Sequence, residues 1–320
     1  MRGSTPMRPW RTGGYRPMRS RSCGNTRPSP ESGGVAGIAL LVACVPLGLV
    51  PTPARATWSI VAVDGATEEV GIAAASCIGG VEVTGGLAPG RGVIAAQALS
   101  NPSARDQAVE LLAAGASPRE VIEQVTTVEF DPESFRSGPK LRQYGVAALG
   151  FEAAAASFTG SWVLGWSGSA HGQGVAVQGN LLYGATVVEA TLATFEAIAP
   201  GTAATLSDRL MAALEAGAAQ GGDKRCAKEL SALSAFIAVA RPGDDARHPY
   251  LRIVAPYAGE TDTSPWTFLR QLLWPQRGDL SENPVTRLRK EYDRWRERNP
   301  RAQERGVVPK ASRARERAQP

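Results

Sequence analysis

TWSIVAVD, from Thr57 to Asp64, is the stretch of sequence that decides the fold. Its β-branched, apolar and aromatic residues predict the first strand of the folded domain. The triplet Ala54-Arg55-Ala56 stands directly before it and has the small-x-small form of a signal peptidase site. Cleavage after Ala56 would leave Thr57 as a free N-terminal residue, and an N-terminal threonine is a ready nucleophile.

The segment before this strand has the features of an export signal. Residues 1–34 are rich in Arg, Gly, Pro and Ser, and Val35–Val50 is an uncharged, mostly apolar run. That run is shorter than the about 20 residues of a transmembrane helix. We therefore expect residues 1–56 to be a signal peptide with a long n-region, in which Met18 is an alternative start. The predicted location is exported, either periplasmic or extracellular.

A lipoprotein is the competing interpretation of the same segment. LVAC ends at Cys44 and has the form of a lipoprotein processing site. Lipidation of Cys44 would leave Thr57 inside the chain rather than at its end. The apolar residues Val45–Val50 that follow count against this alternative, because a lipoprotein tether is usually polar.

The charge of the chain is unevenly distributed. The formal net charge is +5, but the basic excess lies in residues 1–56 and from Arg241 onward, whereas Thr57–Ala240 is acidic overall. A basic balance confined to a targeting segment and a tail does not indicate a nucleic-acid partner. The basic C-terminal part could instead contact an anionic envelope surface peripherally, with a solvated helix as the simpler interpretation.

The cysteine count agrees with export. Of the four cysteines, Cys77 and Cys226 remain after cleavage at residue 56. An even number in an oxidising compartment favours one disulfide between them, while two buried free thiols remain the alternative.

The order of the predicted elements indicates the fold class. The sequence predicts strands and paired helices in the order βββ-αα-βββ-αα-ββ, where strands cover 57–64, 70–76, 92–99, 143–151, 154–160, 174–180, 233–241 and 250–257. The helices begin near Ser103 and Ser117, each a candidate N-cap, and near Thr186 and Thr205. Glu120, three residues after Ser117, predicts a capping box at the second of these helices. A doubly wound fold would alternate single strands and helices, so we expect an α+β fold, a four-layer αββα sandwich.

This order also defines the domain organisation. Residues 57–258 form the predicted domain, and 259–298 contain short helices, of which the second begins at Asn283 or Pro284. Residues 299–320 lack periodicity and are rich in Arg, Ala, Gln and Pro, so we expect a basic, disordered tail.

Few of the familiar catalytic motifs occur in the chain. Its two histidines are His248, in a predicted turn, and His171, in the glycine-rich stretch SGSAHGQG, a predicted loop in which it could line a site. No G-x-S-x-G, H-E-x-x-H or C-x-x-C is present, so neither a serine triad nor a zinc site is indicated. The stretch GGDKR at Gly221–Arg225 follows a predicted helix, which favours a helix end and turn over a phosphate cradle. We expect no metal and no cofactor.

An N-terminal threonine needs none of these motifs. Its α-amino group, with a pKa of about 7.7–8.0 in peptides, can accept the hydroxyl proton, and the hydroxyl can then attack a carbonyl. The resulting oxyanion needs hydrogen-bond donors. The candidate donors at predicted strand ends are Gln97, Asn101, Gln178 and Asn180. The alternative roles are a helix-start turn for Asn101 and a polar strand exit for Gln178 and Asn180.

Seven ordered motifs resemble a known family. TWSIVAVD, AAASC, AAQALSNP, RQYGVAALG, SFTG, VAVQGNLL and GGDKRC with SALSAF together resemble the domain of unknown function 1028, from about Thr57 to Val254. That family is associated with the N-terminal nucleophile hydrolases, so the resemblance implies the αββα sandwich and aligns Thr57 with the threonine that opens the family pattern. Other positions that match are Ser59, Ser76, Gln97, Asn101, Pro102, Arg142, Gln178, Gly179, Asn180, Gly222 and Asp223.

The resemblance also bears on the cysteines and on function. The exported branch pairs an early SC with a late RC, which favours the Cys77–Cys226 bridge, whereas the Arg-rich tail after about Glu291 departs from the family. We expect an exported hydrolase that cleaves an amide bond of a small-molecule or peptide-like substrate, with Thr57 as nucleophile. The alternative is a non-catalytic, envelope-associated binding module of the same fold. The sequence leaves the substrate and the oligomeric state open.

Overall fold

The computed structural model describes residues 57–134, 137–199, 204–256 and 282–300. Several predictions fall outside these ranges: the signal peptide, the cleavage site after Ala56, the lipoprotein site at Cys44, the first of the short C-terminal helices, at 265–274, and the basic tail from residue 301 onward. Within the described ranges, no helix is long and apolar enough to cross a membrane.

A six-stranded antiparallel sheet contains the first predicted strand near its centre. Its strand order is β10-β9-β2-β1-β8-β7. The strands are β1 (Thr57–Asp64), β2 (Glu69–Ser76), β7 (Trp166–Gly172), β8 (Val175–Leu182), β9 (Ser234–Ala240) and β10 (Leu251–Ala255). Strand β1 is flanked by β2 and β8, and all eight of its residues are buried.

A four-stranded antiparallel sheet is the second sheet. Its order is β3-β4-β5-β6. The strands are β3 (Gly85–Ala88), β4 (Gly92–Ala98), β5 (Arg142–Ala148) and β6 (Ala156–Thr159). Strands β4 and β5 are buried along their whole length.

The alternation of side chains along β1 explains how the two sheets meet. Val61 and Val63 belong to an apolar cluster with Val93 and Ala147 of the four-stranded sheet. Ile60 and Ala62, which alternate with them in sequence, point the other way into a cluster with helix residues. Because successive side chains of a strand face opposite sides, β1 is covered on both faces, which accounts for its continuous apolar sequence.

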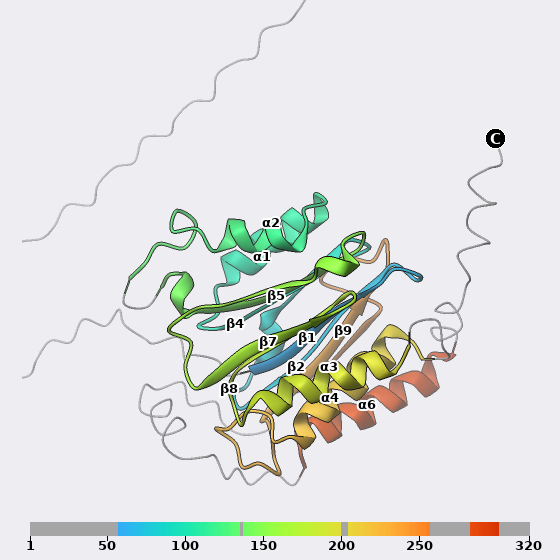
Figure 1. The fold of residues 1–320 in the computed structure, drawn as a ribbon. Coiled ribbons are helices and arrows are strands. Elements are labelled where there is room, and N and C mark those ends of the chain that lie inside the picture. Colours follow the sequence, from blue (N-terminus) through green and yellow to red (C-terminus); the bar gives the residue numbers. More distant parts are fainter. Residues whose placement is uncertain (1–56, 135–136, 200–203, 257–281, 301–320) are drawn as a thin grey trace, which may run out of the picture. The chain divides into compact units, whose positions relative to one another are not determined.

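Helices cover the outer face of each sheet (Figure 1). Helices α1 (Pro102–Ala113) and α2 (Pro118–Val125) pack on the four-stranded sheet. Helices α3 (Ala185–Ala197), α4 (Leu206–Ala219) and α6 (Pro284–Arg298) pack on the six-stranded sheet. Short 3₁₀ turns occur at η1 (Val81–Thr84), η2 (Pro139–Leu141) and η3 (Glu152–Ala154). The chain is thus a mixed α+β fold with two antiparallel sheets and paired helices, which confirms the predicted fold class.

The structure differs from the predicted elements at two strands and one cap. Strands β3 and β7 are additional: the sequence of β7 is WSGSAHG, which predicted a loop, yet it pairs with β8 as an edge strand. The N-cap of α1 is Asn101 rather than Ser103, with Pro102 in the first turn, because the Asn101 carboxamide accepts the Ala104 N–H. The predicted capping box of Ser117 and Glu120 is confirmed.

Helix α6 begins as predicted but is not a solvated helix. Asn283 is its N-cap, and one face buries Leu288 and Tyr292 completely. These two side chains join the apolar cluster of the six-stranded sheet. On the polar side, Arg289 pairs with Glu215 of α4 at 2.5 Å, so part of the basic charge is neutralised within the domain.

Candidate functional site

The start of β1 lies in a row of polar residues on the inner face of the six-stranded sheet. Thr57 is fully buried and stands opposite Asn180 of β8. On the other side of β1, Trp58 is opposite Ala75 of β2, so the same register places Thr57 beside Ser76. Ser76 in turn pairs with Ser234 of β9. Opposed residues of antiparallel strands have Cβ atoms about 5 Å apart.

A buried amide network holds this end of β1 between the two sheets. Ser59, which faces the same side as Thr57, donates to Gln97 Oε1 at 2.7 Å and accepts from Gln178 Nε2 at 2.6 Å. Gln97 Nε2 lies 3.2 Å from the carbonyl oxygen of Thr57 and 2.8 Å from Gln143 Oε1. Gln97 comes from β4 and Gln143 from β5, so the network fixes Thr57 relative to the second sheet.

Gln143 is a central residue of this network that the sequence reasoning missed. Its Oε1 also accepts from Asn180 Nδ2 at 2.9 Å, and its Nε2 donates to Thr159 Oγ1 at 2.9 Å. The only sequence signal was a polar residue placed within the apolar strand RQYGVAA. Gly145 on the same strand is needed for packing, since a Cβ there would lie 1.8 Å from Gln178 Oε1.

Two of the predicted site residues, Arg142 and Asn101, make contacts that stabilise the fold. The Arg142 guanidinium forms a two-point ion pair with Asp131, with Nε–Oδ2 at 2.6 Å and Nη2–Oδ1 at 2.9 Å, and it also donates to the Leu99 carbonyl. Both charged side chains are almost completely buried. Asn101 caps helix α1, accepting from Ala104 N at 3.2 Å. These contacts tie the ends of β4 and β5 to the neighbouring loops.

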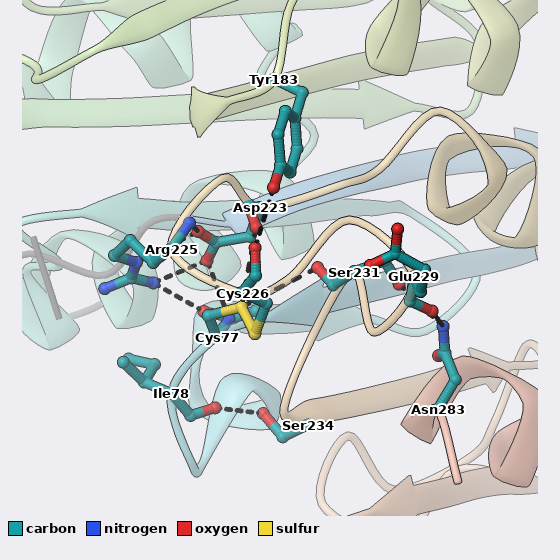
Figure 2. Close-up of a disulfide and its surroundings, with 11 residues drawn as sticks. Cys77, Ile78, Tyr183, Asp223, Arg225, Cys226, Glu229, Ser231, Ser234 and Asn283 are labelled. Carbon is teal, nitrogen blue, oxygen red and sulfur yellow. Dashed lines mark hydrogen bonds and ion pairs between the residues drawn. A yellow bond between two sulfur atoms is a disulfide. The ribbon is translucent and has the colours of Figure 1, made fainter. Parts of the chain in front are cut away.

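Asp223 lies in a second buried cluster, around the predicted disulfide (Figure 2). The Cys77–Cys226 bridge is confirmed, with a Cα–Cα separation of 5.8 Å. Asp223 Oδ2 accepts from Cys77 N at 2.8 Å and pairs with Arg225 Nη2 at 2.7 Å. The same Arg225 nitrogen lies 3.4 Å from Ser76 Oγ, which links this cluster to the polar row beside Thr57.

The segment 222–226 crosses the end of β1. On one side it bonds to the end of β8, through Lys224 N to Leu181 O at 3.0 Å and Tyr183 N to Gly222 O at 3.2 Å. On the other side it bonds to Cys77, directly after β2. Because β8 and β2 flank β1, the segment runs across the position where the chain enters β1 at Thr57.

Unusual backbone geometry gathers at this same end of the sheets. Ala98 follows Gln97, Leu181 follows Asn180, and both have positive φ, of 64° and 52°. Ser231, whose carbonyl accepts the Asp223 N–H, has φ 56°. Residues other than glycine rarely adopt this conformation, and such strain clusters at functional sites. The strain therefore supports the end of the sheets at Thr57 as the candidate site.

The family comparison agrees with the motifs. The model of the family of unknown function (DUF1028) matches residues 57–260. The chain belongs to this family. The crystal structure of protein SPO2555 from Silicibacter pomeroyi, also assigned to DUF1028, matches with a TM-score of 0.56 and 23% identity. The match covers 75% of this chain and 89% of that one, and it supports a shared fold. A search of curated proteins found no match.

His171 is the predicted site residue of this DUF1028 domain that lies apart from the others. It stands opposite Ala176 on β8, four residues from Asn180, or about 13 Å along the strand. Its placement in a loop was wrong, because it belongs to edge strand β7. His171 is an exposed residue of this strand, and partial desolvation of its ring by neighbouring residues lowers its pKa. His248 lies in an exposed turn beside Asp245, at 3.5 Å.

The described residues hold no group of three or more His, Cys, Asp or Glu that could bind a metal ion. The DUF1028 site is instead built from amides and hydroxyls: Thr57, Ser59, Ser76, Gln97, Gln143, Gln178 and Asn180. Its charged side chains, Asp223 and Arg225, pair with each other. Such a site can position a nucleophile and donate hydrogen bonds to a developing negative charge.

Proposed function

We propose that this chain is an exported amide hydrolase in which Thr57, freed by cleavage after Ala56, is the nucleophile. The observation that carries the proposal is the placement of Thr57. It opens a central strand on the face between the sheets, its carbonyl accepts from Gln97, and Asn180 stands opposite it. A cleaved chain would therefore present an amine and a hydroxyl on one fixed residue.

The arrangement of layers supports an N-terminal nucleophile hydrolase architecture, the αββα sandwich. An apolar cluster joins the inner faces of the two sheets, and further clusters join each outer face to its helices. In this proposal the site lies where both sheets end together, so that residues of β1, β4, β5 and β8 contribute to it.

The proposed chemistry uses the α-amine of Thr57 as the general base. The amine takes the hydroxyl proton as the oxygen attacks the amide carbonyl, and it then gives that proton to the departing amine. Water next hydrolyses the acyl-threonine ester and restores the enzyme. The amine pKa of about 7.7–8.0 in peptides leaves a useful fraction neutral near pH 7.

Asn180 is the best-placed candidate to stabilise the oxyanion. Its Nδ2 carries two hydrogens, one of which donates to Gln143, and it stands opposite Thr57. Gln97 has a different role, because its Nε2 contacts three acceptors, including the Thr57 carbonyl and Gln143. We therefore assign Gln97, Gln143 and Gln178 to positioning, and we place Arg142, Asn101 and His171 outside the chemistry.

Export is part of the same proposal. The Cys77–Cys226 disulfide is compatible with an oxidising compartment, and the Ala-x-Ala triplet provides a cleavage site ahead of Thr57. A lipidated chain beginning at Cys44 would keep residues ahead of Thr57 and would have no such amine.

The test is the mature N-terminus followed by turnover of an acyl-amide library. N-terminal sequencing should give Thr57, and Thr57→Ser should keep hydrolysis that Thr57→Ala loses, with the exposed Thr186→Ala as matched control. A mature chain that begins at Cys44 with added lipid mass would overturn the proposal. Ligand binding without turnover in a chain that begins at Thr57 would favour the binding module instead.

A further inference from the structure

Lys224 is an exposed cation fixed next to the candidate site. Its neighbours Asp223 and Arg225 are buried and paired with each other, and Cys226 is held by the disulfide. The Lys224 backbone N–H donates to Leu181 O at 3.0 Å. The stretch GGDKR is thus more than a helix end, because it presents one ammonium group from a rigid backbone.

The path from Lys224 to Thr57 is short. Lys224 bonds to Leu181, the next residue is Asn180, and Asn180 stands opposite Thr57. With about 4.8 Å between strands and about 3.3 Å per residue along them, the two backbones lie roughly 10 Å apart. An amide whose carbonyl meets Thr57 can therefore place a nearby substituent within reach of the Lys224 side chain.

Two residues with exposed apolar side chains lie near Lys224 along the backbone. Its Nζ lies against Gly165, where an added Cβ would be 2.9 Å away. Leu164, the residue before, accepts Leu181 N–H through its carbonyl at 3.2 Å and leaves 45% of its surface exposed. Tyr183 is 43% exposed and is held by hydrogen bonds to Gly222 and Cys226. Beside a charged group, apolar side chains of this kind can supply the hydrophobic part of a ligand pocket.

The charges around Lys224 favour an anion. The nearest carboxylate in sequence, Asp223, is committed to Arg225 and Cys77 N. No carboxylate forms an ion pair with Lys224 among the residues that the structure describes. Its ammonium is therefore open to a negative group brought by a ligand.

We propose that Lys224, Leu164 and Tyr183 form a specificity subsite for an N-acylated amino acid with an apolar side chain. The carboxylate next to the scissile amide would contact Lys224, and the apolar side chain would contact Leu164 and Tyr183. This inference rests on the proposed function, since it places the scissile carbonyl at Thr57.

The test compares ligands that differ only in the carboxylate. N-Acetyl-, N-octanoyl- and N-phenylacetyl-leucine are titrated by calorimetry into the mature Thr57→Ala protein, alongside the same acyl amides of 3-methylbutylamine. A charged hydrogen bond contributes enough for a preference of about tenfold or more for the carboxylate. Lys224→Ala should remove the preference, Lys224→Arg should keep it, and the exposed Lys228→Ala should leave it unchanged.

The outcomes separate this inference from the proposed function. The subsite would be overturned if the two ligand series bind with equal affinity or if neither binds. It would also be overturned if Lys224→Ala weakens the binding of both series equally. Hydrolysis of both series at equal rates by the unmodified chain would overturn the subsite and leave the hydrolase proposal intact. A Lys224-dependent carboxylate preference with no hydrolysis of any compound would support the subsite and count against the hydrolase.

Discussion

The side-chain amide of Gln97 lies 3.2 Å from the carbonyl oxygen of Thr57 and thereby joins the first residue of one sheet to the second sheet. Gln97 also bonds to Ser59 and Gln143, and all four residues are buried. The position of the proposed nucleophile is thus set by side chains rather than by strand pairing alone.

Removal of Gln97 should therefore destabilise the domain and release Thr57. Gln97→Ala takes away the acceptor of the buried Ser59 hydroxyl and the side-chain donor to the Thr57 carbonyl, and a buried unsatisfied group costs about 1–3 kcal/mol. Urea unfolding measures the loss, and the exposed Gln173→Ala is the control. If Gln97→Ala changes the free energy of unfolding by less than about 0.5 kcal/mol, as a typical surface substitution does, the result would contradict the network.

Loss of the disulfide should cost stability without changing the fold. The bridge spans 149 residues, and removal of a native disulfide costs about 2–5 kcal/mol. We expect the Cys77→Ala, Cys226→Ala double variant to unfold at lower guanidinium concentration. The unmodified protein, unfolded in the presence of a reductant, should then resemble the variant; identical midpoints with and without reductant would show that no bridge forms.

Breaking the buried ion pair of Arg142 and Asp131 should destabilise the domain far more than breaking an exposed ion pair. Asp131→Ala leaves the guanidinium buried and uncompensated, at a cost of about 3–5 kcal/mol. The exposed pair Arg119–Glu123 is the comparison, and Glu123→Ala should change stability far less because solvent screens that pair. Thermal unfolding of the two variants checks this contrast, and similar midpoints would be evidence against a structural role for Arg142.

Asn101 should behave as a helix cap. Asn101→Ala removes the acceptor for Ala104 N–H and should lower stability by about 1 kcal/mol. Asn101→Asp and Asn101→Ser provide another acceptor and should keep most of that stability. Chemical denaturation measures the stability of all three. If hydrolysis is detected and Asn101→Ser abolishes it while keeping stability, Asn101 is an oxyanion donor after all.

Glu69 should make stability fall as the pH rises. Burial raises the pKa of this carboxyl, and the hydrogen bond from Arg241 lowers it only in part. Because the pKa of Glu69 is higher in the folded state than in the unfolded state, the folded protein holds the proton more tightly. The contribution of Glu69 to stability is therefore greatest below the unfolded pKa and is lost as the pH rises through the native pKa. Unfolding between pH 4 and about 7 should show this slope in the unmodified protein and not in Glu69→Gln. The exposed Glu110→Gln should keep the slope.

Local signals explain which elements were predictable. The start of β1 at Thr57 and the capping box of Ser117 depend on residues near one another in the chain, and both match. Strand β7 was missed because its glycines and serines have little strand preference, and it exists only through pairing with β8. The burial of Tyr292 on α6 was missed because charged residues dominate that helix.

The candidate site was predictable in location more than in role. Gln97, Gln178 and Asn180 do meet near Thr57, because strand ends gather at one edge of the sheets. What no local pattern revealed is which amide bonds to which, since Gln143 joins partners from separate strands. In the same way Asp223 was identified, but its pairing with Arg225 depends on the folded loop.

The segment 222–226 has a consequence for the timing of maturation. It crosses the start of β1, yet its Cys226 is synthesised 149 residues after Cys77, the partner in the bridge. In a chain that threads through a translocation channel from its N-terminus, the bond ahead of Thr57 emerges long before Cys226 does. Under the proposed export, a processing enzyme would therefore meet that bond before the Cys77–Cys226 disulfide can form.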